Sequence, residues 1–409
     1  MSRPVIFLDD PFRPTIYSWR NYFDHFQAIF KRAFGIQVQS PKWEPSKSKH
    51  LNFNDFYEAC DFSPEENLYW GDIWFAGSEE AQKYLAKHLP KGVIIILHEA
   101  PPWLIDFFKK ESIMFIDTKS SNIRFTADIP IMISTNIASL AKTIYEKYHY
   151  IELDIKFEAQ MLRALIRQRF IDKLDQFKPY NRKLIFIGQT SIDSSIIINK
   201  KGRGYFARLE EFIEPVLALL KEFDGLIYQK HPLAEVRYGK HEAGLLSSVN
   251  RKPVLIGDQL LYNIYSLAED IHAVGFSSGG LVEAPFFGQP STMLLGNSAQ
   301  PYYSANDGVC AYLNLRARDF LSPAFWQDAL ADILEPLSPF TDNLIFESNS
   351  FRMRNNASFN YFKIINQMSW VQRDFLNVFN LEDADRRLAK LEQSRPWARI
   401  KKFFSHCFF

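Results

Sequence analysis

The sequence predicts an α/β fold with two Rossmann-like domains and a C-terminal helical tail. At 409 residues the chain is longer than one hydrophobic core usually serves, so two domains are expected. Hydrophobic residues make up 47% and charged residues 23%, a composition typical of folded globular proteins. In both halves, short apolar runs alternate with stretches of helical periodicity, which favours sheets covered by helices.

The global charge and the cysteines exclude several classes of protein. The net charge is +1, and no block of Lys and Arg precedes the C-terminus, so nothing points to nucleic acid. Cys60, Cys310 and Cys407 are odd in number and widely spaced, which predicts neither a disulfide framework nor a zinc site. The start MSRPVIFLDD lacks a secretory leader, and no apolar run reaches about 18 residues. We therefore expect a cytoplasmic protein.

Residues 1–180 are predicted to form the N-terminal domain. Its apolar runs lack strict alternation, which is typical of parallel strands buried on both faces. A long helical region over 137–178 closes the domain, and Pro179 in the KPYN segment marks the boundary. The expected strands are 5–10, 68–77, 92–100, 112–118 and 130–135.

Residues 181–350 are predicted to form a second doubly wound domain. Helices are expected around 205–222, through 259–268 and from Gly280, between strands of the same apolar character. A helical tail over 351–409 follows. The expected strands are 183–189, 225–232, 253–258, 270–278 and 291–296.

Polar residues follow three strands of this second domain. In open α/β sheets, ligands bind beyond the carboxyl ends of the strands, so these residues are the first candidates for a site. The segment GQTSIDSS (188–195) follows one strand. Lys230, His231 and Pro232 follow the next, and they combine a cation for phosphate with an imidazole donor. A histidine bonded only to backbone is an equally good interpretation of His231 alone.

A serine-rich turn follows the strand at 270–278. Ser277, Ser278 and Gly279 stand where the strand gives way to a helix, so hydroxyl and backbone N–H groups converge there and favour an anion. Glu283 lies in the first turns of that helix, where it is placed to accept hydrogen bonds from ribose or a base. Ordinary capping explains the same residues equally well.

Taken together, the three strand ends resemble the bacterial capsular polysaccharide biosynthesis family, and within it the retaining β-Kdo transferases that use CMP-Kdo. The resemblance covers about 110 residues, and Ile192 and Leu281 depart from the family's pattern. It implies a metal-independent GT-B glycosyltransferase, with two Rossmann-like domains facing a cleft and no cofactor beyond the donor CMP-Kdo. The matching residues are Tyr180, Asn181, Gln189, Asp193, Ser194 or Ser195, Lys230, His231, Pro232, Ser277, Ser278, Glu283, Gly288 and Pro290.

Retention of configuration, which the resemblance implies, requires a nucleophile in a double displacement. Asp193 is the candidate, oriented by Gln189 and the neighbouring hydroxyls. The lysine, the imidazole and the serine-lined turn would stabilise departing CMP without a divalent ion. The alternative is that Asp193 caps the next segment or closes an Asx turn.

The acceptor is expected to bind the first domain, where one of Asp10, His98, Glu99 and Glu158 would act as the acid/base; for each of them taken alone, a structural role is the stronger interpretation. The segment KKGRGYFAR (200–208) carries four cations that would neutralise the Kdo carboxylate if it is not simply a solvated loop.

The C-terminal run RPWARIKKFFSHCFF (395–409) mixes cations with aromatic residues, so it either touches the anionic inner membrane, where lipid-linked glycans are found, or packs on the protein. Three functions stay open: a β-Kdo transferase, another CMP-sugar enzyme such as a sialyltransferase, and a noncatalytic nucleotide- or glycan-binding module.

Overall fold

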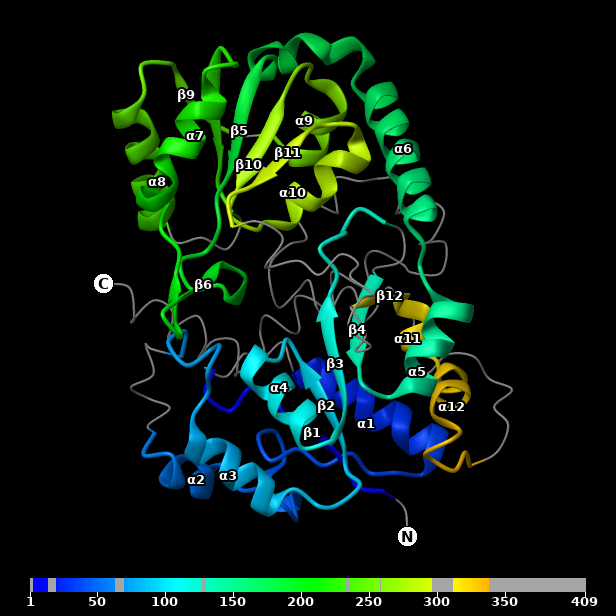
Figure 1. The fold of residues 1–409 in the computed structure, drawn as a ribbon. Helices are drawn as coiled ribbons and strands as arrows, with labels where there is room; N and C mark the ends of the chain where they lie inside the picture. Colours follow the sequence, from blue (N-terminus) through cyan, green and yellow to red (C-terminus); the bar gives the residue numbers. More distant parts are fainter. Residues whose placement is uncertain are drawn as a thin grey trace, which may run out of the picture. The chain divides into compact units, whose positions relative to one another are not determined.

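The computed structural model describes residues 3–13, 20–62, 70–126, 130–231, 236–257, 259–295 and 312–337 (Figure 1). The chain divides into two compact units, residues 1–354 and residues 355–409. The second unit, with the predicted helical tail, lies outside the described residues, as do Pro232, Cys310 and Cys407. The described part is mixed α/β and contains two five-stranded sheets and a two-stranded one.

The first sheet has the order β1-β2-β3-β4-β12. β1, β2 and β3 are parallel, whereas β4 is antiparallel to β3, and β12 is antiparallel to β4. The sheet is therefore mixed, and the expectation of a purely parallel one was wrong. β12 falls within the range expected for the second domain. It nevertheless pairs with β4, although all strands of the second sheet lie between the two in the sequence. The strands are β1 (Val5–Phe7), β2 (Ile94–His98), β3 (Met114–Ser120), β4 (Pro130–Thr135) and β12 (Leu313–Arg316).

Both faces of the first sheet are buried, which explains the unbroken apolar runs. In β2, Ile94 and Ile96 point into one core and Ile95 and Leu97 into the other, because side chains alternate along a strand. The first core is completed by α1 (Arg20–Phe34), α5 (Ala138–Thr143), α11 (Ala317–Phe320) and α12 (Pro323–Leu330). The second is completed by α2 (Phe53–Ala59), α3 (Glu79–His88) and α4 (Pro102–Lys110).

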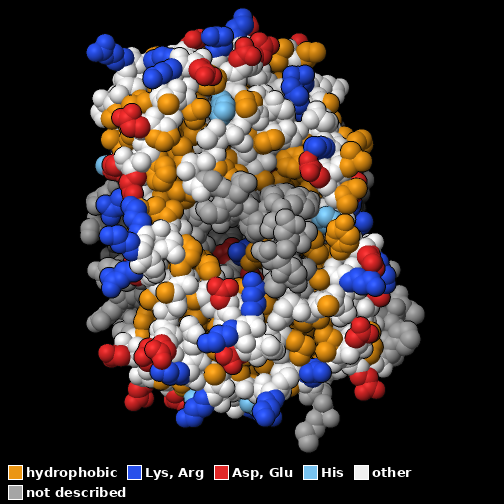
Figure 2. Space-filling view, viewed as in Figure 1, with side chains coloured by type: hydrophobic (Ala, Val, Ile, Leu, Met, Phe, Trp, Pro, Cys, Tyr) orange, Lys and Arg blue, Asp and Glu red, His pale blue; other side chains and the backbone are white. Residues whose placement is uncertain are grey.

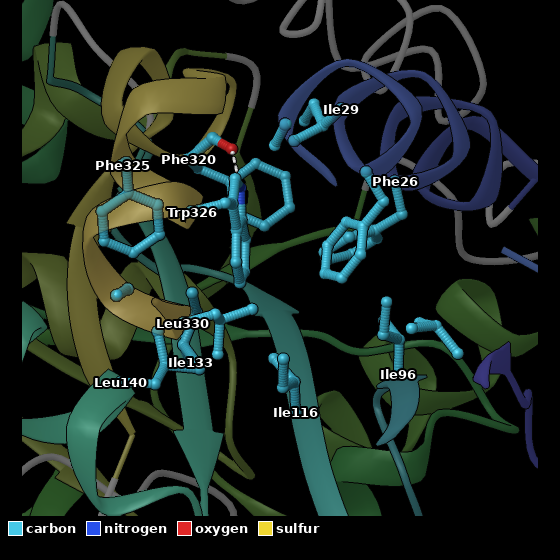
Figure 3. Packing of buried hydrophobic residues seen from close by; sticks show 14 of the residues in the cluster. Phe26, Ile29, Ile96, Ile116, Ile133, Leu140, Phe320, Phe325, Trp326 and Leu330 are labelled. Atoms are coloured by element: carbon cyan, nitrogen blue, oxygen red, sulfur yellow. Dashed lines mark hydrogen bonds between the residues drawn. The ribbon is translucent and has the colours of Figure 1, made fainter. Parts of the chain in front are cut away.

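Trp326 of α12 lies at the centre of the first core (Figure 3). It is completely buried, and its ring meets those of Phe26 and Phe325 at centroid distances of 5.4 and 4.9 Å. Its indole Nε1 donates to the backbone oxygen of Phe320 at 2.7 Å, so no polar group is left unpaired by its burial. Residues near position 326 are thus part of the core built on the N-terminal strands.

The described residues 70–77 of the segment expected as a strand over 68–77 form no strand. Residues 70–76 form consecutive turns instead. The reason is that Trp70 and Trp74 do not pack on a sheet. They pack with Ile197 and Phe206 in a separate apolar cluster. Aromatic residues favour strands only where they find a pleated surface to pack on.

The second sheet is parallel throughout, with the order β11-β10-β5-β8-β9. Numbered along the chain within the sheet, this is 5-4-1-2-3, the order of a Rossmann-type sheet. The structure confirms the five predicted strands with shorter bounds. They are β5 (Lys183–Ile187), β8 (Gly225–Gln229), β9 (Val254–Ile256), β10 (His272–Gly275) and β11 (Ser291–Met293). Helices α7 (Ile213–Leu220), α8 (Val236–Val249), α9 (Leu261–Leu267) and α10 (Gly279–Glu283) lie between them.

The region 137–178 is helical, as predicted, but in several pieces. The π-helix η4 (Ile144–Tyr148) follows α5, and the chain is then extended until α6 (Glu152–Arg169) begins. The 3-10 helix η5 (Ile171–Tyr180) ends the region and contains Pro179. α6 packs against the second sheet's helices, where Gln160 donates to the backbone oxygen of Phe286 at 2.9 Å.

A hairpin follows the first strand of the second sheet. The 3-10 turn η6 (Ser194–Ile196) leads into β6 (Ile197–Lys200), which pairs with β7 (Arg203–Phe206), and η7 (Leu209–Phe212) follows. The segment 200–208, one interpretation of which was a solvated loop, is therefore largely ordered as strand and turn. Lys200, Lys201 and Arg203 are exposed, and Figure 2 shows basic side chains gathered over this hairpin.

Gly204 lets the hairpin dock on the turn segment 70–76. Its backbone N–H donates to the Asp72 backbone oxygen at 3.0 Å, and a Cβ there would lie 2.1 Å from the backbone oxygen of Gly71.

No helix among the described residues combines the length and apolar character needed to cross a membrane.

Candidate functional site

The three polar strand ends of the second sheet converge at one edge. Ile187 at the end of β5 lies opposite both Gly275 of β10 and Gln229 of β8, so the loops that follow emerge side by side. β5 and β10 are neighbours at the point where the strand order reverses. In sheets of this kind the crevice for ligands opens at that point. We call the residues 188–195, 230–231 and 276–283 the strand-end cluster.

Ser195 links two of the three loops. Its hydroxyl accepts a hydrogen bond from Gln189 Nε2 at 3.3 Å and another from the Ser277 hydroxyl at 2.9 Å. Gln189 and Ser277 are buried, so these bonds are shielded from water. The structure thus joins Gln189, Ser195 and Ser277, three residues that the sequence singled out separately.

Asp193 caps the 3-10 turn that follows it. Its Oδ1 accepts from the backbone N–H of Ser195 at 2.8 Å, so the Asx-type interpretation of this residue is correct for one carboxylate oxygen. The side chain is half-buried, and the carboxylate acts electrostatically on His231 across the cluster. The cap fixes the orientation of the carboxylate while leaving it part of the cluster.

His231 is held as a neutral imidazole. Burial lowers its pKa to about 4; the Asp193 carboxylate opposes this shift and the Arg124 guanidinium adds to it. At neutral pH the ring therefore carries one N–H donor and one acceptor. Its neighbour Lys230 is half-buried, and its aliphatic stem passes close to Gly239 of α8.

Ser278 and Gly279 begin α10, which has only five residues. Ser278 makes no side-chain cap, while its backbone oxygen accepts from Leu281 at 2.9 Å. A Cβ on Gly279 would lie 3.1 Å from the backbone oxygen of Asn122, so glycine here permits the close approach of a loop from the first sheet. Gly288 adopts a left-handed conformation, with φ of 78°, where the following turn η8 (Ala284–Phe287) ends.

Glu283 has partners within the protein. Its carboxylate accepts from the Tyr262 hydroxyl at 2.9 Å and from the backbone N–H of Arg124 at 2.6 Å. The residue is 3% exposed, and burial raises its pKa to about 7 although Arg124 opposes the shift. A ribose or a base, as the sequence suggested, would bind this carboxylate in addition to those partners.

Arg124 is a residue that sequence reasoning missed. It lies in the loop 121–126 between β3 and β4 and thus belongs to the first sheet, yet it reaches α10 of the second. The signal available was the polar stretch TKSSNIR after a predicted strand of the first domain, where strand ends were already expected to face a cleft. Only the fold reveals where that loop is seated.

Glu158 lies on α6 and is bonded to Tyr150. The Tyr150 hydroxyl donates to the Glu158 carboxylate, and the guanidinium of Arg316 lies 4.3 Å from the centre of the tyrosine ring. Tyr150 also donates its backbone N–H to Asn314 of β12 at 2.8 Å. The structure therefore places Glu158 beside β12 of the first sheet.

The carboxyl edge of the first sheet holds a second polar group. Asp9 and Asp10 follow β1 and are almost completely buried, and burial raises the pKa of each to about 6. The ammonium of Lys42 lies 3.9 Å from Asp9, and burial lowers its pKa. Buried carboxylates with raised pKa values are more frequent at functional sites than elsewhere.

His98 ends β2 in a defined tautomer. The Thr118 hydroxyl has a single proton, which it donates to the Leu97 backbone oxygen at 2.9 Å. The Thr118 oxygen therefore accepts a hydrogen bond from the N–H at His98 Nδ1, 3.1 Å away. The imidazole lone pair is then on Nε2. Burial lowers the pKa of His98 to about 4, so the ring is a neutral base.

Glu99 follows with a positive φ of 53°, an unfavourable conformation for a non-glycine residue. Its carboxylate pairs with Arg13 at 3.1 Å. Burial raises its pKa, but Arg13, His98 and Lys119 together outweigh burial and lower it. Asp117 of β3 bonds to the Tyr312 hydroxyl, and burial raises its pKa to about 6.

Within the described ranges, no group of three His, Cys, Asp or Glu side chains is arranged to hold a metal ion.

No protein-family model matches this sequence, and no curated protein matches it. Among solved structures, the chain is similar to Thermosulfurimonas dismutans KpsC, a β-Kdo 2,7 transferase, with 16% identity and a TM-score of 0.36 over 87% of this chain and 99% of that one.

Proposed function

We propose that this protein is a retaining β-Kdo glycosyltransferase that moves Kdo from CMP-Kdo to a bacterial surface glycan, without a metal cofactor. The observation that carries the proposal is the link Gln189–Ser195–Ser277, which joins two strand-end loops at the switch point of a parallel sheet. Asp193 is the acid nearest this link along the chain, capping the backbone N–H of Ser195.

In the proposed first step, Asp193 attacks the anomeric carbon of Kdo. A carbon–oxygen bond to the carboxylate forms, the bond to the CMP phosphate breaks, and its electron pair leaves with CMP. The cap to Ser195 holds one carboxylate oxygen of Asp193 in place, so the other oxygen is the one that attacks. Lys230 supplies a positive charge and neutral His231 an N–H donor for the departing phosphate, with Ser194, Ser277, Ser278 and Gly279 around it.

In the second step, an acceptor hydroxyl attacks the same carbon and the bond to Asp193 breaks, so configuration is retained overall. The acceptor proton passes to a base in or beside the first sheet. Asp10, His98, Glu99 and Glu158 are the candidates. A lipid-linked acceptor and peripheral contact with the inner membrane are part of the proposal.

The test is to trap the intermediate. Intact-protein mass spectrometry after mixing with CMP-Kdo and no acceptor should show the mass of one Kdo residue added, mapping to Asp193. Asp193→Asn keeps an oxygen that can accept from Ser195, so the fold stays intact while the nucleophile is lost. We expect turnover to fall on the order of 10³-fold or more.

The matched control is Asp224→Asn, because Asp224 is exposed and pairs with Arg182 at 3.1 Å at the opposite edge of the sheet. Release of CMP from CMP-sialic acid but not from CMP-Kdo would instead indicate a sialyltransferase. Binding of CMP with no turnover of either donor would indicate a noncatalytic module. Anomeric inversion in the product, determined by NMR, would contradict the double displacement.

A further inference from the structure

The loop 121–126 of the first sheet is anchored on the second by an aromatic side chain. Phe125 is 1% exposed and lies among Tyr262, Phe286 and Phe287, with ring centroids 6.2, 6.0 and 5.1 Å away. Burial of so large an apolar side chain stabilises the contact, so it holds the loop in place.

Two further contacts fix the same loop, one at Arg124 and one at Asn122. The buried carboxylate of Glu283 accepts from the Arg124 backbone N–H at 2.6 Å. The Asn122 backbone oxygen approaches Gly279 so closely that a Cβ there would lie 3.1 Å away. The backbone of residue 124 is therefore fixed at the first turns of α10, directly after Ser277 and Ser278.

The positive charge of Arg124 reaches two loops of the strand-end cluster. It contributes to lowering the pKa of His231, on the loop after β8, and it opposes the raised pKa of Glu283 in α10. The backbone contacts to Glu283 and Gly279 independently place the residue at this edge of the sheet.

The cations first considered for the donor are placed differently. Lys200, Lys201 and Arg203 are exposed on the β6–β7 hairpin, and Lys200 is paired with Glu211 at 2.7 Å. Arg124 is half-buried and its backbone is held by Glu283, so less of the loop's entropy is lost when a ligand is bound.

We infer that Arg124, contributed by the first sheet, completes an anion-binding site in the strand-end cluster of the second sheet, with Lys230 and His231. Its ligand is an anionic group of the donor, the phosphate or the sugar carboxylate. A guanidinium presents two parallel N–H donors that match either group. The identity of the donor rests on the proposed function, whereas the anion site does not.

The test compares Arg124→Gln and Arg124→Lys with the wild type by calorimetric titration of cytidine, CMP and CMP-Kdo. The substitutions leave the backbone bond to Glu283 unchanged, so the loop stays seated. Arg251→Gln is the matched control, since Arg251 is exposed and precedes β9 at the opposite edge of the same sheet. Cytidine, which carries no anion, should bind all variants equally.

Loss of a charge-assisted hydrogen bond should weaken anion binding about 10- to 100-fold in Arg124→Gln and less in Arg124→Lys. If CMP and CMP-Kdo are weakened alike, the phosphate is the ligand; if only CMP-Kdo is weakened, it is the carboxylate. Affinities for both that match those of Arg251→Gln would overturn the inference.

A second probe separates this inference from the proposed function. Inorganic phosphate is titrated at pH 7 while the ring signals of His231 are followed by NMR. A response in the wild type that disappears in Arg124→Gln supports the anion site even if CMP-Kdo is not the donor. If phosphate leaves the His231 ring unaffected and CMP binding is equal in wild type and Arg124→Gln, no such site exists, whatever the enzyme transfers.

Discussion

Phe125 and Phe287 meet edge to face with ring centroids 5.1 Å apart, although one follows a strand of the first sheet and the other ends a turn of the second. The contact seats the loop 121–126 beside α10. It means that the strand-end cluster is bordered by residues from both sheets.

Ser277→Ala should weaken donor binding because it removes the hydroxyl that donates to Ser195 at 2.9 Å. A neutral hydrogen bond contributes about 0.5–1.5 kcal/mol, so we expect KM for CMP-Kdo to rise about 2- to 10-fold. Steady-state kinetics of Ser195→Ala, Ser277→Ala and the double variant measure the coupling. If the two single effects simply add, the serines do not act together.

The stability of the protein should fall more steeply with pH than that of Glu283→Gln. Burial raises the pKa of Glu283 from 4.5 to about 7, so its contribution is fully present below pH 4.5 and is lost as pH rises through 7. The shift corresponds to about 3 kcal/mol. Glutamine keeps an oxygen for Tyr262 and Arg124. Urea unfolding between pH 5 and 8 should show the difference between the two proteins shrinking or reversing as pH rises.

Gly204→Ala should undock the β6–β7 hairpin, because the added Cβ would lie 2.1 Å from the Gly71 oxygen. We expect a loss of about 1–3 kcal/mol in the free energy of unfolding. Gly244→Ala is the control, since nothing lies within 4 Å of a Cβ at that position and it lies within α8. There the replacement should stabilise by about 0.5–1 kcal/mol. Equal effects at both sites would show that the hairpin tolerates displacement.

Lys42→Met should destabilise the protein by about 3–5 kcal/mol, because it leaves Asp9 buried without its cation 3.9 Å away. The double variant Asp9→Asn with Lys42→Met removes both charges and should recover most of the loss. Chemical unfolding at pH 8, where Asp9 is ionised, gives the largest effect, since burial raises its pKa to about 6. A single variant as stable as the wild type would mean that solvent reaches Asp9.

Transfer should persist in EDTA, since CMP leaves as a phosphate monoester that Lys230, His231 and Arg124 can stabilise. CMP release measured before and after chelation checks this. Activity abolished by EDTA and restored by magnesium or manganese would show that a cation is required.

The second sheet was predictable because each strand is a short apolar run followed by a turn signal, and those local cues agree with the fold. The segment 68–77 was misassigned because its aromatic residues pack on the β6–β7 hairpin, a partner distant in sequence. β12 could not be recognised, since Leu313 pairs with Ile133 and the whole second sheet lies between these two residues in the sequence. Within the site, residue types at strand ends indicated Gln189, Ser195 and Ser277, whereas Arg124 depends on where a loop is seated.

The pairing of β4 with β12 has a consequence for biosynthesis. All five strands of the second sheet leave the ribosome before Leu313 does. That sheet can therefore form while the first sheet still lacks its last strand and the helix that carries Trp326. Until those residues emerge, Phe26 and its neighbours stay uncovered. A chain terminated before position 313 would leave part of the first core exposed, and such a fragment would be prone to aggregate.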